Sequence, residues 1–379
     1  MDDLSTPTLD RGSRLIRRVA TLVFFGLVPV VAVLVALSVW VGDGRAGFDL
    51  RHAFLPAAHD VLDGNSPYPA PGDSEVAGRH AYVYTPVVAF ATVPFTAIPE
   101  DAAIDIGMVA SFGAVIAALL LVGVRDWRCY TVALVWPPVI NSAGNVAVSL
   151  PLAVLLAAAW RWRRREAGSG VLVGCAVAAK SFAWPMLVWP VVIRRWRSSW
   201  VALTVAVALS LGTWAVIGFA GLRQYPDLVR AVTDAQEDDS YSLSGVLLAL
   251  GAGTTLARAA LAVLTVGLVW AAFAFGRNGS EPQAFAALLI AALATTPLLW
   301  QHYLVMLLVA LAVTHPRLSF AWLLPLVLYL APMTGNGRLW QTLLVSVLAA
   351  VVGASCLLPA RRPATVPTAP QGAVPVPER

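Results

Sequence analysis

The chain has 379 residues, of which 59% are hydrophobic and only 12% are charged. Soluble domains average about 25% charged and 45–50% apolar residues, so this composition excludes an ordinary water-soluble fold. The charged residues cluster between apolar runs, many of which approach the roughly 20 residues that a spanning helix needs. The sequence therefore predicts an all-α, polytopic transmembrane protein with about ten to twelve helices, several of them broken or half-spanning.

The formal net charge of +5 does not indicate nucleic-acid binding, because the arginines lie beside the apolar runs. Arginines at the ends of spans are typical of cytoplasmic loops. We therefore expect a multi-pass protein of the cell membrane, in contact with lipid and not with nucleic acid. Three arginine groups carry this prediction: Arg11, Arg14, Arg17 and Arg18; Arg161, Arg163, Arg164 and Arg165; and Arg194, Arg195 and Arg197.

The first apolar run, at 19–42, is long enough to span and follows four arginines, which predicts a cytoplasmic N-terminus at 1–18. It exceeds the apolar core of a cleaved signal peptide. The polar segments 43–82 and 221–242 are then expected as two outer loops of a single transmembrane domain at 19–358. Residues 359–379, rich in Pro, Ala and Val, are expected to form a disordered cytoplasmic tail.

Prolines interrupt several apolar runs, where a helix must kink or end. Broken helices at membrane depth are tolerated where they are buried or line a cavity. The basic loops at 161–166 and 194–197 both belong on the cytoplasmic side, so we expect 170–193 to form a hairpin of two half-helices that breaks between Lys180 and Pro185. Cytoplasmic placement of Arg125 and Arg128 requires an odd number of crossings over 83–124, where two apolar runs occur.

Asp49 lies a few residues beyond the first helix, in the first outer loop. A carboxyl at the bilayer edge beside apolar neighbours can have a raised pKa and act as a base. A helix cap or a solvated loop charge is the competing interpretation, and position alone favours it. Farther along the same loop, 57–68 is expected to form a short amphipathic helix, ended by a glycine turn and lying on the membrane surface.

Lys180 is the only lysine in the chain, and it lies inside apolar sequence. An ionisable group at that depth is costly and indicates a partner such as a phosphate or a carboxylate, although snorkelling to the interface is an alternative. His302 lies among aromatic residues where Pro297 breaks an apolar run. It is either a hydrogen-bonded core residue or a phosphate ligand.

Asn141 and Asn145 bracket a turn between two short apolar runs. They are expected either to bind sugar hydroxyls or to satisfy the broken backbone. The five histidines show no metal-ligand spacing, and the sequence carries no nucleotide-binding fingerprint. The cysteines, which are isolated in apolar sequence, are Cys129, Cys175 and Cys356. We therefore expect no metal and no cofactor.

Several of these residues recur as motifs in a fixed order: Asp49; Leu62-Asp63-Gly64-Asn65-Ser66-Pro67-Tyr68; Tyr84-Thr85-Pro86; Gly144-Asn145; Gly170 to Lys180; Arg194-Arg195-Trp196-Arg197; and Pro297 to His302. Over residues 15–315 this order resembles the GT-C glycosyltransferases, specifically the polyprenyl-phosphate-mannose-dependent α-(1→2)-mannosyltransferases of glycosyltransferase family 87. Asn145 replaces the usual Gln, the Asn expected after it is absent, and Pro185 follows Lys180 later than the family pattern. These departures concern the sugar and the acceptor more than the reaction class.

The resemblance implies a GT-C enzyme that moves mannose from a polyprenyl-phosphate donor to a cell-envelope glycolipid or polysaccharide on the outer face, with inversion. It implies Asp49 as the general base and requires no cofactor or metal. Around the donor phosphate we expect Lys180 and His302, with Arg51, His52 and Arg223 as further candidates. Residues expected to bind the sugar or acceptor are Tyr68, Tyr84, Asn141, Asn145 and Trp300.

The same residues also suit other functions. Within the same class, the donor sugar could be arabinose, which would make the protein an arabinofuranosyltransferase. Broken helices and an intramembrane lysine also suit a lipid or sugar transporter or flippase, but such proteins often contain an inverted repeat, which this sequence lacks. An envelope scaffold is the third possibility, and it predicts that replacing Asp49 or His302 has no effect.

Overall fold

The computed structural model describes residues 11–78, 80–332 and 338–358. Within these ranges the chain is helical and contains no β-strand, as predicted. Five described helices are long and apolar enough to cross a membrane, or six if the bent pair α8 (Pro137–Asn145) and α9 (Ser149–Arg161) is one span. The predicted total of about ten to twelve is reached only if shorter apolar helices are also counted. The tail predicted at 359–379 lies outside the described residues.

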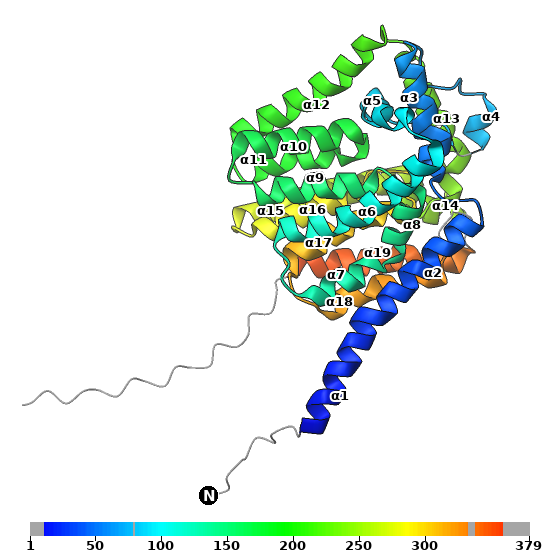
Figure 1. The fold of residues 1–379 in the computed structure, drawn as a ribbon. Helices are drawn as coiled ribbons and strands as arrows, with labels where there is room; N and C mark the ends of the chain where they lie inside the picture. The colour runs from blue at the N-terminus through cyan, green and yellow to red at the C-terminus, as the bar shows by residue number, and fades with distance from the viewer. Residues whose placement is uncertain (1–10, 79, 333–337, 359–379) are drawn as a thin grey trace, which may run out of the picture.

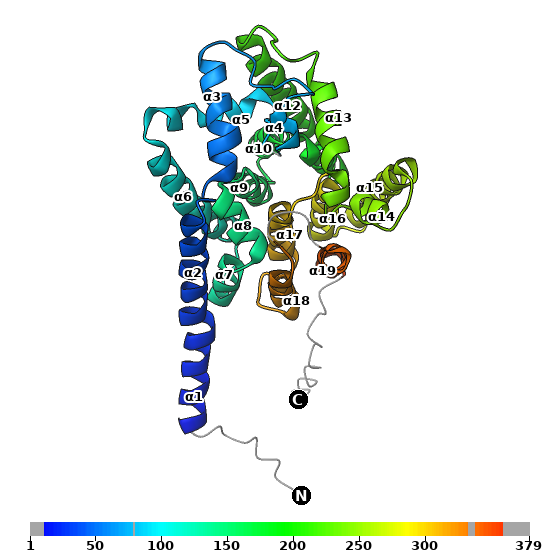
Figure 2. The ribbon, with the colours of Figure 1, turned by 90° about the vertical axis from the view of Figure 1, so that its right-hand side faces the viewer.

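The N-terminal helix runs along one side of the bundle, where α2 (Val28–Gly42) contacts α7 (Trp127–Leu134) and α8, and its first part projects beyond the bundle (Figures 1 and 2). It is continuous through α1 (Arg11–Leu22), a π-helical turn η1 (Val23–Leu27) and α2, which confirms a helix at the first apolar run. Only 6% of its candidate span is buried in the protein. A helix that is apolar on all sides and unburied suits contact with lipid.

A bundle of helices forms the larger part of the molecule and contains the main hydrophobic core, with Trp136, Trp189, Phe285 and Trp322 in it. In Figure 1, α9, α10, α12 and α16 lie side by side. Besides α8 and α9, the bundle comprises α6 (Glu100–Val122), α7 (Trp127–Leu134), α10 (Glu166–Ala179), η4 (Ser181–Val188), α11 (Trp189–Val192), α12 (Trp196–Val216), α15 (Thr254–Arg277), α16 (Glu281–Ala294), η6 (Gln301–Val305), α17 (Met306–Thr314), α18 (Phe320–Leu323), η7 (Leu324–Leu330) and α19 (Leu339–Leu357).

The polar segments predicted as outer loops fold into short helices over one end of the bundle (Figure 2). They share a second hydrophobic cluster, which includes Leu50, Phe54, Tyr82, Trp214 and Leu228. The short helices are η2 (Leu50–Phe54), α3 (Leu55–Leu62), α4 (Ser74–Ala77), α5 (Pro86–Thr92), η3 (Val93–Ala97), α13 (Tyr225–Gln236), η5 (Glu237–Asp239) and α14 (Leu243–Ala249).

The helix predicted at 57–68 occurs with different boundaries. Helical structure runs from Leu50 to Leu62 and stops before Gly64, whose φ of +73° suits the glycine turn that was expected. Ala57, Ala58 and Val61 are buried, and Ala57 and Val61 belong to a cluster that also contains residues of α5. The C-terminal boundary at 68 was therefore wrong, because the left-handed turn ends the helix earlier.

The hairpin predicted at 170–193 is confirmed. α10 ends at Ala179, Lys180 is extended with φ −148° and ψ 106°, and η4 begins at Ser181. The two basic loops lie at the same end of the bundle, because Arg197 and residues 165–168 line one surface hollow. Arg163 also pairs with Glu281 of α16 at 3.2 Å, so α9, α10 and α16 all have one end on this side.

The crossing count over 83–124 also becomes clear. The first of the two apolar runs forms α5 and η3, which together span only Pro86–Ala97. The second forms α6, a 23-residue helix that is the candidate span within this range. One crossing is an odd number, so Arg125 and Arg128 can lie on the cytoplasmic side as predicted.

Two short helices leave a recess at the end of the bundle that faces away from the basic loops. α10 and α16 each have 14 residues, which corresponds to about 21 Å and falls short of a hydrocarbon core of about 30 Å. Their far ends, at Lys180 and Thr295, therefore lie below the level that a full span would reach. The outer segments cover this recess.

Close backbone contact holds the first outer loop on α8. The Gly47 N–H donates to the Gly144 carbonyl at 2.6 Å, and Gly47 has a φ of +69°. A Cβ on Gly47 would come within 2.5 Å of the Ile104 side chain. Only glycine meets both requirements without strain, so this residue fixes the approach of the loop that carries Asp49.

Gly47→Ala is expected to destabilise the protein more than Gly44→Ala. Gly44 has a similar φ of +64° but open space around its Cβ position, so alanine there costs only the left-handed backbone, about 1–2 kcal/mol. At Gly47 the clash with Ile104 adds about 1–3 kcal/mol. Thermal unfolding of both variants in detergent measures the difference. Equal melting temperatures would show that the contact with Ile104 does not hold the loop.

Candidate active site

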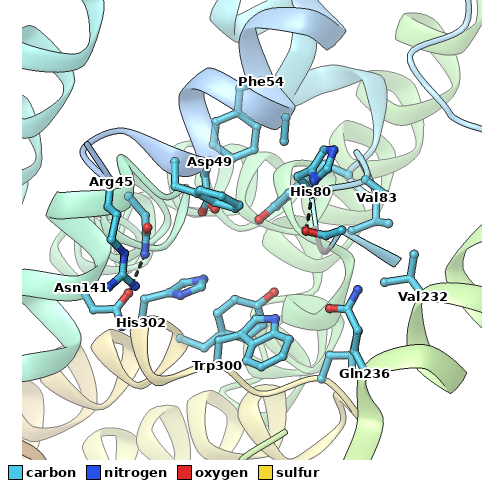
Figure 3. A pocket seen from close by; sticks show the side chains of 18 of the residues that line it. Arg45, Asp49, Phe54, His80, Val83, Asn141, Val232, Gln236, Trp300 and His302 are labelled. Carbon is cyan, nitrogen blue, oxygen red and sulfur yellow. Dashed lines mark hydrogen bonds between the residues drawn. The ribbon is translucent and has the colours of Figure 1, made fainter. Parts of the chain in front are cut away.

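A cavity of about 560 Å³ lies between the first outer loop and the broken ends of the bundle helices. Asp49 and Phe54 line it on one side, and Asn141, Trp300 and His302 lie opposite (Figure 3). Residues from the second half of the first loop and from α13 close a further side; those labelled in Figure 3 are His80, Val83, Val232 and Gln236. The cavity therefore joins both outer segments to the bundle.

Asp49 points into this cavity (Figure 3). It precedes η2, but its side chain makes no capping hydrogen bond, so the helix-cap interpretation fails. Burial raises the pKa of the Asp49 carboxyl above its usual range, and the Lys180 ammonium opposes part of that rise. A carboxylate with a raised pKa is a stronger base than an exposed aspartate.

A chain of buried amides forms the wall opposite Asp49. Asn145 Nδ2 donates to Asn141 Oδ1 at 2.6 Å, and Asn141 Nδ2 donates to Gln301 Oε1 at 3.4 Å. Gln301 Nε2 in turn donates to the Leu328 carbonyl at 3.3 Å. Both asparagines line the cavity, so these amides are held in fixed orientations where they can bind hydroxyl groups.

The segment that carries Trp300 and His302 is irregular, and residues 240–242 hold it in place. The Leu299 N–H donates to Ser240 Oγ at 2.7 Å, and the Tyr241 N–H donates to the Leu299 carbonyl at 2.9 Å. Ser242 Oγ donates to the Pro297 carbonyl at 2.7 Å. These bonds satisfy backbone groups that the break at Pro297 frees, which an apolar environment requires.

A second cavity of about 320 Å³ adjoins the first. Lys180 and Phe182 line it, while Tyr84 and Tyr303 line both cavities. Thr85 Oγ1 donates to the Ala178 carbonyl at 2.5 Å, and this bond holds the Tyr84 segment beside the end of α10. Lys180 and Asp49 are thus neighbours that open into different cavities.

Four residues expected at the site line neither cavity. Tyr68 is buried among Tyr82, Trp214 and Tyr225 and donates to the Tyr84 carbonyl at 2.9 Å. Arg51 pairs with Glu100 and Asp101 at the start of α6. The other two are His52, whose ring packs near Phe48 and His80, and Arg223, which is exposed. All four lie in the outer segments, but their side chains face other residues or solvent and not the cavities.

Sequence reasoning missed Arg45, Tyr303 and Gln301. Arg45 lines the first cavity (Figure 3), and only its position four residues before Asp49 signals this. Tyr303 follows His302 directly and lines both cavities. Gln301 accepts a hydrogen bond from Asn141 and so holds the amide chain in place. In the part of the chain that the structure describes, no group of three or more His, Cys, Asp or Glu residues could hold a metal ion.

A family model described as Glycosyltransferase family 87 matches residues 82–300, which is more than half of the chain. The chain belongs to this family. It is therefore a membrane glycosyltransferase with several candidate spans, and the predicted resemblance to family 87 is confirmed. No curated protein and no solved structure matches it.

The matched region ends before part of the site. It contains Tyr84, Asn141, Asn145 and Lys180 but not Asp49, because it begins at residue 82. The fold brings Asp49 of this glycosyltransferase to the matched residues through the contact of Gly47 with Gly144. The first outer loop is thus part of the same cavity as the family region.

Ser240→Ala is expected to weaken both stability and sugar transfer. It leaves the buried Leu299 and Ser242 N–H groups without their acceptor, at a cost of about 1–3 kcal/mol, and it frees the segment before Trp300. Thr265→Val is the matched control, because the Thr265 hydroxyl is also buried but bonds only within its own helix. Melting temperature and transfer rate are measured for both. A Ser240→Ala protein as active as the control would contradict this positioning role.

Proposed function

We propose that this glycosyltransferase moves a sugar, with mannose as the expected one, from a polyprenyl-phosphate donor to a cell-envelope glycolipid or polysaccharide. One observation carries the proposal. A half-buried carboxyl, Asp49, and the only lysine, Lys180, line two adjoining cavities that meet at Tyr84 and Tyr303. Such an arrangement supplies a base for the acceptor and a cation for the leaving phosphate.

In the proposed reaction, the acceptor hydroxyl enters the larger cavity and transfers its proton to the Asp49 carboxylate. The acceptor oxygen attacks the anomeric carbon from the side opposite the phosphate, and the bond between that carbon and the phosphate oxygen breaks. The oxygen keeps the electron pair, so one direct displacement inverts the anomeric configuration. Lys180 from the second cavity and His302 from the first stabilise the negative charge that develops on the departing lipid phosphate, which lies where the two cavities meet.

The remaining lining residues suit a sugar. Trp300 and Tyr84 present aromatic rings to the first cavity, and Asn141 and Asn145 present amides. A few fixed polar groups among apolar and aromatic walls are typical of small-molecule sites, because the polar groups orient the ligand while the walls exclude water.

The second cavity suits the lipid side of the donor. Phe182, Val229 and Trp184 line it together with Lys180, and the Trp184 side chain is 43% exposed. A phosphate held at Lys180 would therefore have an apolar path toward the surface of the protein. The short α10 and α16 leave room there for a chain that full-length spans would exclude.

The site is proposed to face the outer side of the plasma membrane. The basic loops lie at the opposite end of α10 from Lys180, and such loops are retained in the cytoplasm. The outer segments that cover the cavities would then meet substrates presented from the outer leaflet.

Asp49→Asn is expected to lower the transfer rate by at least about 100-fold, because the amide cannot accept the proton. The assay uses purified protein with polyprenyl-phosphate mannose and, separately, polyprenyl-phosphate arabinose, each with a panel of envelope glycolipids. Asp43→Asn is the control, since Asp43 is exposed, ends α2 and lines neither cavity.

One outcome would identify the sugar and the base together: the protein uses only one donor, and Asp49→Asn abolishes this transfer but not donor binding, while Asp43→Asn has no effect. Transfer from the arabinose donor alone would make the protein an arabinofuranosyltransferase with the same mechanism. Transfer that survives Asp49→Asn would overturn the proposed base. If neither donor is used, lipid movement across vesicles becomes the reaction to measure.

Lys180→Met is expected to slow transfer by about 100-fold, through loss of charge stabilisation at the phosphate. It should also move the acidic limb of the pH–rate profile to higher pH. The ammonium favours the Asp49 carboxylate and lowers its pKa, so its removal lets the base become protonated at a higher pH. Lys180→Arg keeps the positive charge, so its acidic limb should lie at the same pH as that of the wild-type protein. A limb that does not move in Lys180→Met would show that Asp49 does not titrate under the influence of Lys180.

A further inference from the structure

Tyr84 and Tyr303 lie where the two cavities meet. Both residues line the first cavity and the second, as do Val83, Val232 and Leu298. Asp49 and His302 line only the first cavity, whereas Lys180 lines only the second. The two tyrosines therefore lie where the cavity of the carboxyl meets the cavity of the ammonium.

The Lys180 ammonium is held by aromatic rings. Its Nζ lies 3.5 Å from the centroid of the Tyr303 ring, 5.1 Å from that of Tyr84 and 5.4 Å from that of Phe182. It also donates to the Tyr84 hydroxyl at 3.5 Å. Lys180 is only 6% exposed, and cation–π attraction is strongest when the cation is desolvated. The aromatic contacts thus compete with any carboxylate for this ammonium.

The Tyr303 ring is fixed from both sides. It stacks on Phe182 with centroids 5.3 Å apart and an angle of 19° between the planes. His302 meets it edge-on at 4.7 Å. The Tyr303 ring cannot rotate without breaking its contacts with Phe182 and His302. Its position beside Lys180 is therefore fixed.

Asp49 and Lys180 form no ion pair with each other, and neither takes part in any ion pair found among the described residues. A half-buried carboxylate and a buried ammonium whose charges influence each other gain from direct pairing, because pairing offsets part of the cost of burial.

We propose that Tyr303 is a positioning residue whose ring keeps the Lys180 ammonium apart from the Asp49 carboxylate, so that the base and the phosphate-binding cation act in separate cavities. The inference rests on the proposed function, in which Asp49 is the base. Without the ring, the ammonium would move to the carboxylate, and each group would neutralise the other before a substrate bound.

Other titratable groups around Asp49 must be distinguished from Lys180. Arg51 and His52, on the helix that follows Asp49, line neither cavity and contact Glu100, Asp101 and His80. The titratable or charged groups that line the two cavities besides Asp49 are Arg45, His80, Tyr84, Lys180, Tyr225, His302 and Tyr303.

The experiment measures the pH–rate profile of sugar transfer for Tyr303→Leu, Tyr303→Phe, Lys180→Met and the double variant Tyr303→Leu/Lys180→Met. An opposite charge within about 4–6 Å lowers a carboxyl pKa by about one to three pH units. Tyr303→Leu is therefore expected to move the acidic limb to lower pH by about one unit or more, and to reduce the plateau rate because an ion-paired carboxylate is a weaker base. Tyr303→Phe keeps the aromatic ring, so its acidic limb should lie at the same pH as that of the wild-type protein.

In the Lys180→Met background, Tyr303→Leu should leave the limb where Lys180→Met alone places it. A shift that persists in that background would come from another group, such as His302, and would overturn the proposal. A Tyr303→Leu limb equal to the wild-type limb would also overturn it. If Asp49→Asn itself keeps its activity, the proposed function fails instead, so the two failures are distinguishable.

Discussion

The structure depends on hydrogen bonds that satisfy the backbone of broken helices. An apolar bundle cannot leave peptide groups unpaired, and this protein interrupts its helices at Lys180 and around Pro297. Thr85 of the first outer segment donates to the end of α10. Ser240 and Ser242 of the second accept from and donate to the segment around Leu299. The outer segments therefore complete the hydrogen bonding of the bundle. The bundle helices end early, and the cavities lie between those ends and the outer segments that cover them.

The break between α10 and η4 allows a lysine to lie inside the apolar bundle with its ammonium in a cavity. A lysine in the middle of a continuous apolar helix would have lipid or side chains around it, whereas Lys180 lies at an extended residue between α10 and η4. Its side chain opens into a cavity with aromatic walls. The same breaks bring Asp49 close enough for its pKa to respond to Lys180. A carboxyl with a raised pKa in a cavity is a candidate for a functional site.

Two neighbouring regions of sequence behave differently in the structure. The motif 62–68 correctly predicted a glycine turn, but its tyrosine, Tyr68, packs into the second hydrophobic cluster with Trp214 and Tyr225. Tyr84, from the next motif, reaches both cavities. Both tyrosines follow polar, turn-rich sequence, so no local pattern separates them. What separates them is the direction in which the chain approaches α10, and contacts distant in sequence set that direction.

The sequence by itself determined the membrane class, the common end of the bundle at which the two basic loops lie, the break at Lys180 and the family. These features follow from apolar run length, arginine placement, proline and motif order, which are local or composition-based. It also singled out Asp49, Lys180, Asn141, Asn145 and His302. Only the tertiary structure decided that Asp49 and Lys180 line different cavities, that Tyr303 lines both and contacts Lys180, and that Arg51 pairs with α6 instead of facing the site. The physical reason is that side-chain direction and cavity walls depend on packing between segments more than 100 residues apart, such as the contact of Lys180 with Tyr303, and periodicity along one segment carries no information about them.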